Sequence, residues 1–161
     1  MTKRLFPASA ICFLAMLGIA MPRGAGADAP RLTADVIQKI LAAAVAKARE
    51  VKAPMGVAVV DQGGNLVGFI KMEGAFVHTN HTAFAKAYTA ASVRKPTHET
   101  GIPPHIVTEL ASTTGGKFTV LPGGLPLVVD GVVIGGIGVG GGNAEQDLAV
   151  AKAGAAAIAG R

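Results

Sequence analysis

Histidine is the residue type in this chain with the widest range of chemical roles, and all four histidines fall between positions 78 and 105. They are His78, His81, His98 and His105. A neutral imidazole can act as a general acid or base, or bind a metal through a ring nitrogen. His78 and His81 are three positions apart, so in a helix both project from one side. This region is therefore the first candidate for a chemical site.

His81 shares a helical stripe with Phe84, Ala85 and Tyr88. Such a stripe places an imidazole beside an apolar and aromatic surface, which suits the axial ligand of a haem iron. Two other interpretations remain open. The pair could bind Zn or Cu, although no third-ligand motif such as H-E-x-x-H accompanies it, or the histidines could be ordinary structural residues.

Charged residues offer two further patterns. Arg94, Lys95 and Lys117 could pair with ligand carboxylates such as haem propionates, or could simply be surface charges, as most basic side chains are. Glu145 and Asp147 are the nearest pair of carboxylates in the final helix. Two residues apart, they point in different directions, which favours a role at the helix N-terminus over a catalytic dyad.

The segment 136–141 reads G-I-G-V-G-G and satisfies the G-x-G-x-x-G pattern of dinucleotide sites. Such a site needs a following strand with an acidic residue about 20 residues later, whereas this chain has only a helical segment there. In a strand, Gly136, Gly138 and Gly140 lie on one face. That bare face predicts either a closely packed helix or the floor of a ligand site.

Hydrophobic periodicity predicts the elements that position these residues. Helices are expected from Thr33 as N-cap to about Val51, over 79–93, over 104–112, and from a capping box at Asn143 to about Ile158. Strands are expected over 55–60, 66–72, 117–121, 127–130 and 132–139, with a tight turn at Asp130-Gly131. Adjacent strands joined by hairpins predict a single α+β domain with an antiparallel sheet.

The N-terminus has the pattern of a secretory signal peptide. Lys3 and Arg4 precede an apolar run over 5–19, and small residues follow at 25–27. The run is shorter than the roughly 20 residues that span a bilayer. We predict a signal peptide over 1–27 with cleavage after Ala27 (Ala20 is the alternative), a mature domain over 28–161, and export to a periplasm or the medium.

Cleavage changes the charge and the cysteine content. Three of the 15 Lys and Arg residues leave with the signal, so 12 remain against 10 Asp and Glu, a net charge of +2. This charge is too small and too dispersed for a nucleic-acid surface. Cys12 also leaves, which excludes disulfides and thiolate sites in the mature chain. We expect neither a nucleic-acid partner nor a membrane association after cleavage.

A family resemblance runs through nearly all of the mature chain. The segments 57–66, 72–75, 85–90, 94–97, 123–127, 133–139 and 144–147 resemble, in order and spacing, the GlcG/HbpS-like haem-binding family, which is related to the C-terminal domain of PduO. The resemblance implies a profilin-like fold with a five-stranded antiparallel sheet flanked by helices, a homo-oligomer, and haem as cofactor. Where relatives carry Gly-Val-Ser-Gly, this chain has Gly-Val-Gly-Gly over 138–141.

These observations predict an exported haem-binding protein that captures, buffers or senses haem rather than turning over a substrate. We expect His81 to bind the iron, with His78 and then His105 as the next candidates, and Tyr88, Arg94 and Lys117 to line the site. One alternative is an enzyme that acts on a small organic acid in the same groove, with histidine as acid or base. Another is a non-catalytic oligomeric adaptor.

Overall fold

The computed structural model describes residues 31–159. In chain order the elements are α1 (Ala34–Glu50), β1 (Gly56–Asp61), β2 (Leu66–Lys71), α2 (Thr79–Val93), the short 3-10 helix η1 (Thr97–Glu99), α3 (Pro104–Thr113), β3 (Gly124–Val129), β4 (Val132–Gly140) and α4 (Ala144–Ala156). The positions of all four predicted α-helices are confirmed. The predicted signal peptide over 1–27 lies outside the described residues.

The strands form one antiparallel sheet in the order β2-β1-β4-β3. The two hairpins β1–β2 and β3–β4 meet along β1 and β4, so the central strands come from different halves of the chain. The β3–β4 turn contains Asp130 with φ 50° and Gly131 with φ 77°, the left-handed pair that tight hairpins require. Pairing of β1 with β4 therefore joins the two hairpins into one sheet, with β2 and β3 at its edges.

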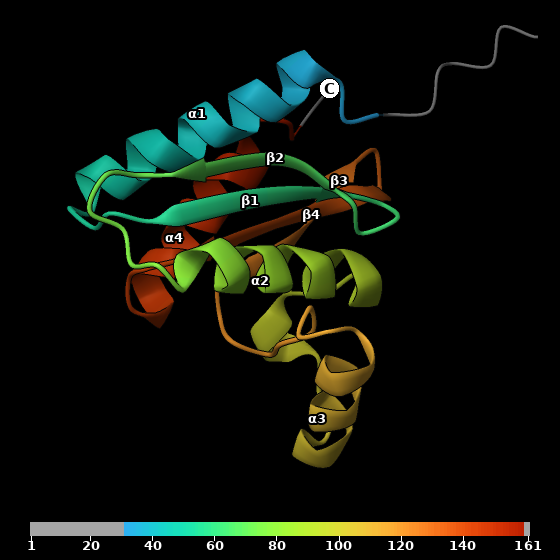
Figure 1. Cartoon of the computed structure of the whole chain (residues 1–161). Coiled ribbons are helices and arrows are strands. Elements are labelled where there is room, and N and C mark those ends of the chain that lie inside the picture. The colour runs from blue at the N-terminus through green and yellow to red at the C-terminus, as the bar shows by residue number, and fades with distance from the viewer. Residues whose placement is uncertain (1–30, 160–161) are drawn as a thin grey trace, which may run out of the picture.

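Helices cover both faces of this sheet (Figure 1). The helices α1 and α4 lie together on one face, over a core that includes Ile40, Val57, Leu127, Ile137 and Val150. The helix α2 covers the other face, over a smaller cluster of Ala58, Val60, Ala83, Ala87 and Ala91. The chain thus forms an α+β domain of three layers.

The expected number of five strands is wrong for residues 31–159, because the segment 117–121 forms no strand. Phe118 is buried, and the N–H of Thr119 donates to Thr89 Oγ1 on α2 at 2.9 Å. This segment is therefore held by a side chain of α2 and not by a strand ladder. The next strand, β3, begins at Gly124, three residues earlier than predicted.

Glycines of β4 allow α2 to approach the sheet closely. A Cβ at Gly136 would collide with the carbonyl oxygen of Ala87, and one at Gly138 with that of Ala83. Helix backbone therefore rests directly on strand backbone, which confirms close helix packing at these two glycines. The third glycine of the pattern, Gly140, lies beyond this contact and borders the pocket described below.

Candidate functional site

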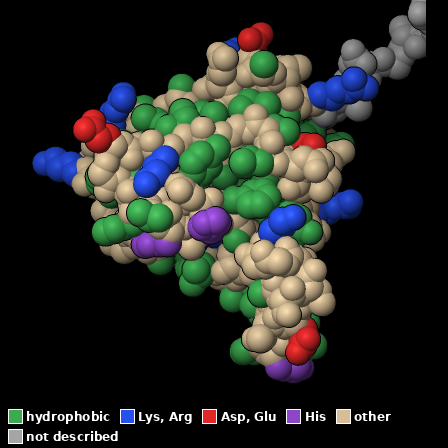
Figure 2. All heavy atoms as spheres, in the orientation of Figure 1, with side chains coloured by type: hydrophobic (Ala, Val, Ile, Leu, Met, Phe, Trp, Pro, Cys, Tyr) green, Lys and Arg blue, Asp and Glu red, His purple; other side chains and the backbone are tan. Residues whose placement is uncertain are grey.

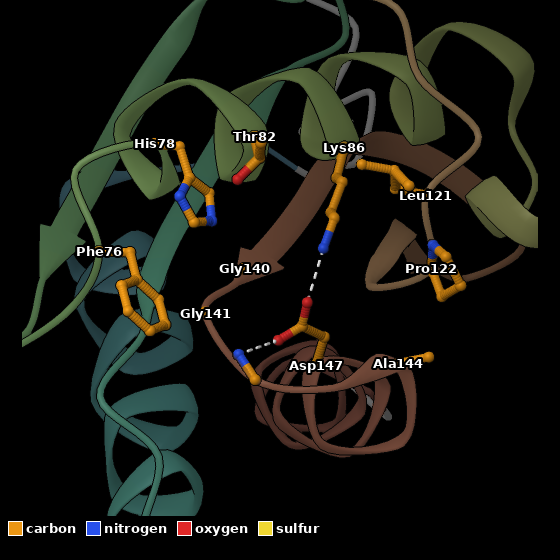
Figure 3. Close-up of a pocket in the computed structure, with 11 residues that line it drawn as sticks. Phe76, His78, Thr82, Lys86, Leu121, Pro122, Gly140, Gly141, Ala144 and Asp147 are labelled. Carbon is orange, nitrogen blue, oxygen red and sulfur yellow. Dashed lines mark hydrogen bonds and ion pairs between the residues drawn. The ribbon is translucent and has the colours of Figure 1, made fainter.

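Charged and hydroxyl side chains of the described residues surround a pocket of about 390 Å³ at the N-terminal ends of α2 and α4 (Figure 3). Small-molecule sites in proteins have volumes of about 300–1,000 Å³. The pocket is lined by Phe76, His78, Thr82, Lys86, Leu121, Pro122, Gly140, Gly141, Gly142, Ala144 and Asp147. Its walls therefore come from α2, from the segment before β3, and from the connection between β4 and α4.

A buried ion pair forms the polar centre of this pocket. Lys86 Nζ lies 2.6 Å from Asp147 Oδ2 and also donates to the carbonyl oxygen of Val139 at 2.7 Å. The other carboxylate oxygen of Asp147 accepts the N–H of Gly142 at 2.9 Å. Lys86 is 5% exposed and Asp147 is 4% exposed. The pair joins α2 to the start of α4, as the dashed lines of Figure 3 show.

Burial raises the pKa of the Asp147 carboxyl above its ordinary value of 3.8, while Lys86 and the Gly142 N–H act in the opposite direction. Removal from water disfavours the charged form of a carboxyl group, and a nearby cation favours it. The charge of Asp147 therefore depends on Lys86 more than the charge of an exposed aspartate would depend on its partner.

A hydroxyl group without a protein partner lies beside the ion pair. Thr82 Oγ1 is buried and makes no hydrogen bond to any group in residues 31–159. Thr82 precedes Lys86 by one helical turn, so both side chains point to the same side of α2 (Figure 3). A Cβ at Gly140 would come within 2.9 Å of this oxygen. The bare glycine leaves room in front of the hydroxyl.

Hydrogen bonds of the Thr97 side chain hold in place the pocket wall that the segment before β3 forms. Thr97 Oγ1 donates to the carbonyl oxygen of Leu121 at 2.6 Å and accepts the N–H of Gly124 at 3.2 Å. Between them, Gly123 has φ 108°, and a Cβ there would come within 2.8 Å of the Asp147 Cβ. Only glycine suits this position, because the chain passes directly over the ion pair in a left-handed conformation.

His78 and His81 have different surroundings. His78 precedes α2 as its N-cap residue, stacks on Phe76 with ring centroids 5.5 Å apart, and lines the pocket. His81 is exposed in the first turn of α2 and does not line that pocket. The two histidines are thus close in sequence, but only His78 belongs to the site of Lys86.

His81 adjoins a second surface, which we call the aromatic face and define as His81, Phe69, Phe84 and Tyr88. Phe69 of β2 and Phe84 of α2 pack on the same alanine-rich cluster. Tyr88 meets Phe84 edge to face with centroids 6.3 Å apart. Figure 2 shows hydrophobic side chains gathered over the surface between β2 and α2, with histidine side chains beside them.

The remaining predicted site residues, Arg94, Lys117 and His105, do not line the pocket and are not among the residues that define the aromatic face. Arg94 follows α2 in a left-handed conformation, 13 residues after His81, so helical rise separates their Cα atoms by about 20 Å. Lys117 is exposed in the segment before β3, and His105 is exposed in the first turn of α3. Their roles as ligand contacts stay predictions.

The ion pair was not foreseen from the sequence. The prediction that Glu145 and Asp147 diverge is confirmed, since Glu145 is exposed and Asp147 is buried, but Asp147 does more than stabilise a helix end. The position of Lys86 in the sequence was the one signal that could have indicated a buried ion pair. Lys86 lies between Ala83, Ala87 and Ala90 on the small-residue side of α2, where a cation needs a partner.

No group of three or more His, Cys, Asp or Glu side chains in residues 31–159 is arranged to hold a metal ion. No helix in the same part of the chain is long and apolar enough to cross a membrane.

Comparison with known proteins identifies the family. Residues 32–156 match the model of the family described as "Haem degrading protein HbpS-like". The chain belongs to the HbpS-like family. It is 37% identical over 124 residues to a 15.0 kDa protein of the dhaT–dhaS intergenic region of Citrobacter freundii, covering 75% of this chain and 87% of that protein.

Two further comparisons concern PduO. The chain is 34% identical over 125 residues to the corrinoid adenosyltransferase PduO of Salmonella typhimurium, covering 76% of this chain but only 37% of PduO. The solved structure of a PduOC:heme complex superposes with a TM-score of 0.71 at 32% identity, covering 80% of this chain and 96% of that chain. The family resemblance seen in the sequence is confirmed.

Proposed function

We propose that this protein binds haem on the aromatic face, with His81 as the ligand of the iron. Two observations support the proposal. The exposed imidazole of His81 stands one helical turn from Phe84, beside half-buried aromatic rings. The structurally similar PduOC domain was solved in complex with heme. These residues fit one face of a haem, because the donor is an imidazole and its surroundings are apolar.

Each residue of the aromatic face has a distinct role in this proposal. Phe69, Phe84 and Tyr88 cover porphyrin surface and exclude water from it, while the haem supplies the open coordination position of its iron. His81 must be neutral to donate its ring nitrogen, so binding weakens in acid. The function we propose is capture, buffering or sensing of haem.

A titration with hemin tests the proposal. The protein without residues 1–27 is expected to develop a saturable Soret band that shifts or weakens in His81→Ala. His98→Ala is the matched control, because His98 is exposed and pairs with Glu99. His78→Ala and His105→Ala rank the two other candidate ligands. A spectrum identical to that of hemin in buffer would refute haem binding. An unaltered His81→Ala spectrum would refute His81 as the iron ligand.

We also propose that the protein is a homo-oligomer. The helix α3 contacts no other helix or strand in residues 31–159 and projects from the domain (Figure 1). Helices of fewer than about 12–15 residues are marginal in water without packing partners, and α3 has 10 residues. Its apolar side includes Ile106, Val107 and Leu110. A second copy of the chain would give this side a partner.

We also propose that the protein is exported after cleavage of a signal peptide. A basic start, an apolar run over 5–19 and small residues at 25–27 support a cleaved signal peptide. N-terminal sequencing of protein from the producing cell tests it. A mature N-terminus at Asp28, or at Met21 for the alternative site, supports export, and an intact Met1 contradicts it.

A further inference from the structure

We propose that the pocket of Lys86, Asp147 and Thr82 binds a small carboxylic acid, independently of haem. This pocket lies on the other side of α2 from the aromatic face. Lys86 and Thr82 line it, whereas the aromatic ring of Tyr88 packs toward Gly64 in the β1–β2 turn. The two surfaces therefore offer two different ligand chemistries on one helix.

The groups that face the pocket are mainly hydrogen-bond donors. Lys86 has three N–H protons, of which Val139 and Asp147 occupy two. The hydroxyl of Thr82 bonds to no protein group among residues 31–159. A ligand that supplies an acceptor oxygen satisfies both, and few buried polar groups in proteins lack a partner.

The charge at the pocket favours an anionic acceptor over a neutral one. Asp147 neutralises Lys86 in the pair, but the N-terminus of α4 reaches the pocket at Ala144. The N-terminal end of a helix carries about half a positive charge. His78 on the rim can donate a further hydrogen bond from a ring N–H. Glu145 is the other acidic residue in this turn; it is exposed and does not line the pocket.

The lining of the pocket suits a ligand with one apolar part. The open glycine backbone of 140–142 forms the floor, and apolar side chains form the two sides, Phe76 on one and Leu121 with Pro122 on the other (Figure 3). A carboxylate with a short apolar stem can place its charge at Lys86 and Thr82 and its stem between these sides. The volume of about 390 Å³ leaves ample room for such a molecule.

Butyrate is a suitable probe. With purified protein free of haem, we expect butyrate to cause saturable chemical-shift changes at the amides of Gly140, Gly141 and Gly142, with a Kd on the order of millimolar for so small a ligand. Butyramide, which has the same shape without the charge, should bind at least several-fold more weakly. Sodium chloride at equal ionic strength corrects for salt.

Thr82→Val tests the assignment of the residues. It removes the hydroxyl at nearly constant volume, and we expect butyrate to bind about tenfold more weakly, the loss of one hydrogen bond to a charged group. The unfolding free energy should not fall, because the hydroxyl has no protein partner to lose. Ser92→Ala, an exposed position of α2 outside the pocket, is the matched control and should bind butyrate as the wild type does.

The results that overturn this proposal are distinct from those that overturn haem binding. No saturable shift up to about 0.1 M butyrate, equal binding of butyramide, or equal binding by Thr82→Val and Ser92→Ala would each refute the carboxylate site. None of these measurements involves haem. A protein that binds hemin but not butyrate would leave the proposed function intact and remove only this inference.

Discussion

At the scale of single residues, the pairing of Lys86 with Asp147 is the interaction that most depends on burial. Attraction between exposed ions contributes little to stability, since water screens it. The partners here are almost completely removed from water, and each charge compensates the other. Losing one partner leaves an uncompensated buried charge, which is far more costly than losing a surface ion pair.

Lys86→Met should therefore lower the unfolding free energy at pH 7 by about 3–5 kcal/mol, measured by urea unfolding. The matched control is Lys47→Met. Its pair with Glu50 has a similar 2.8 Å separation but is exposed, and its loss should stay below about 1 kcal/mol. The double variant Lys86→Met/Asp147→Leu should recover most of the stability. Equal losses in the two single variants would contradict the role of burial.

The loss in Lys86→Met should also depend on pH. Burial already raises the pKa of Asp147, and removing the cation raises this pKa further. The folded variant then binds a proton more tightly than the unfolded chain does, so its stability increases as pH falls through the folded-state pKa. The deficit relative to wild type should shrink between pH 7 and pH 5. A deficit that grows over this range would contradict the assignment.

At the scale of elements, the contact between α2 and β4 depends on the absence of side chains. Gly138→Ala would drive a Cβ into the carbonyl oxygen of Ala83, which cannot move without displacing the helix. We expect a loss of about 3 kcal/mol in thermal or urea unfolding, at the upper end for overpacking. Gly140→Ala meets only the side chain of Thr82 within 3 Å and should cost clearly less. Similar losses would contradict backbone contact as the cause.

The elements themselves were largely predictable from local signals. The cap at Thr33, the capping box of Asn143 with Gln146 and the turn at Asp130 depend on neighbouring residues only, and all three are confirmed. The segment 117–121 was not predictable in this way. Its apolar residues have strand character, but its conformation is set by Thr89, which lies about 30 residues earlier in the chain.

The site was less predictable than the fold, for a related reason. Lys86 and Asp147 are 61 positions apart, and each has a plausible role without the other: a helix-surface cation and a residue near a helix N-terminus. Their meeting depends on the pairing of β1 with β4, which brings α2 and α4 to the same end of the sheet. The histidine pattern, by contrast, depends only on residues close together in the sequence and could be recognised without the fold.

At the scale of the whole molecule, the helix α3 stands out because it packs on no other helix or strand within residues 31–159. If a second copy packs on it, Ile106→Asp should shift the protein to smaller species in sedimentation velocity measured over a range of concentrations. Thr108→Asp is the matched control: it places the same residue in the same exposed helix, away from Ile106. A wild-type monomer at all concentrations, or equal behaviour of the two variants, would contradict an interface at α3.

The close contact of α2 with β4 has a final consequence for how ligands arrive. With no layer of side chains between helix and sheet at Gly136 and Gly138, α2 has no room to move closer to the sheet. Both flanks of the helix are therefore preformed surfaces, and a ligand on either flank meets groups already in position. Association should then be governed by diffusion and access, with little delay from rearrangement of the fold.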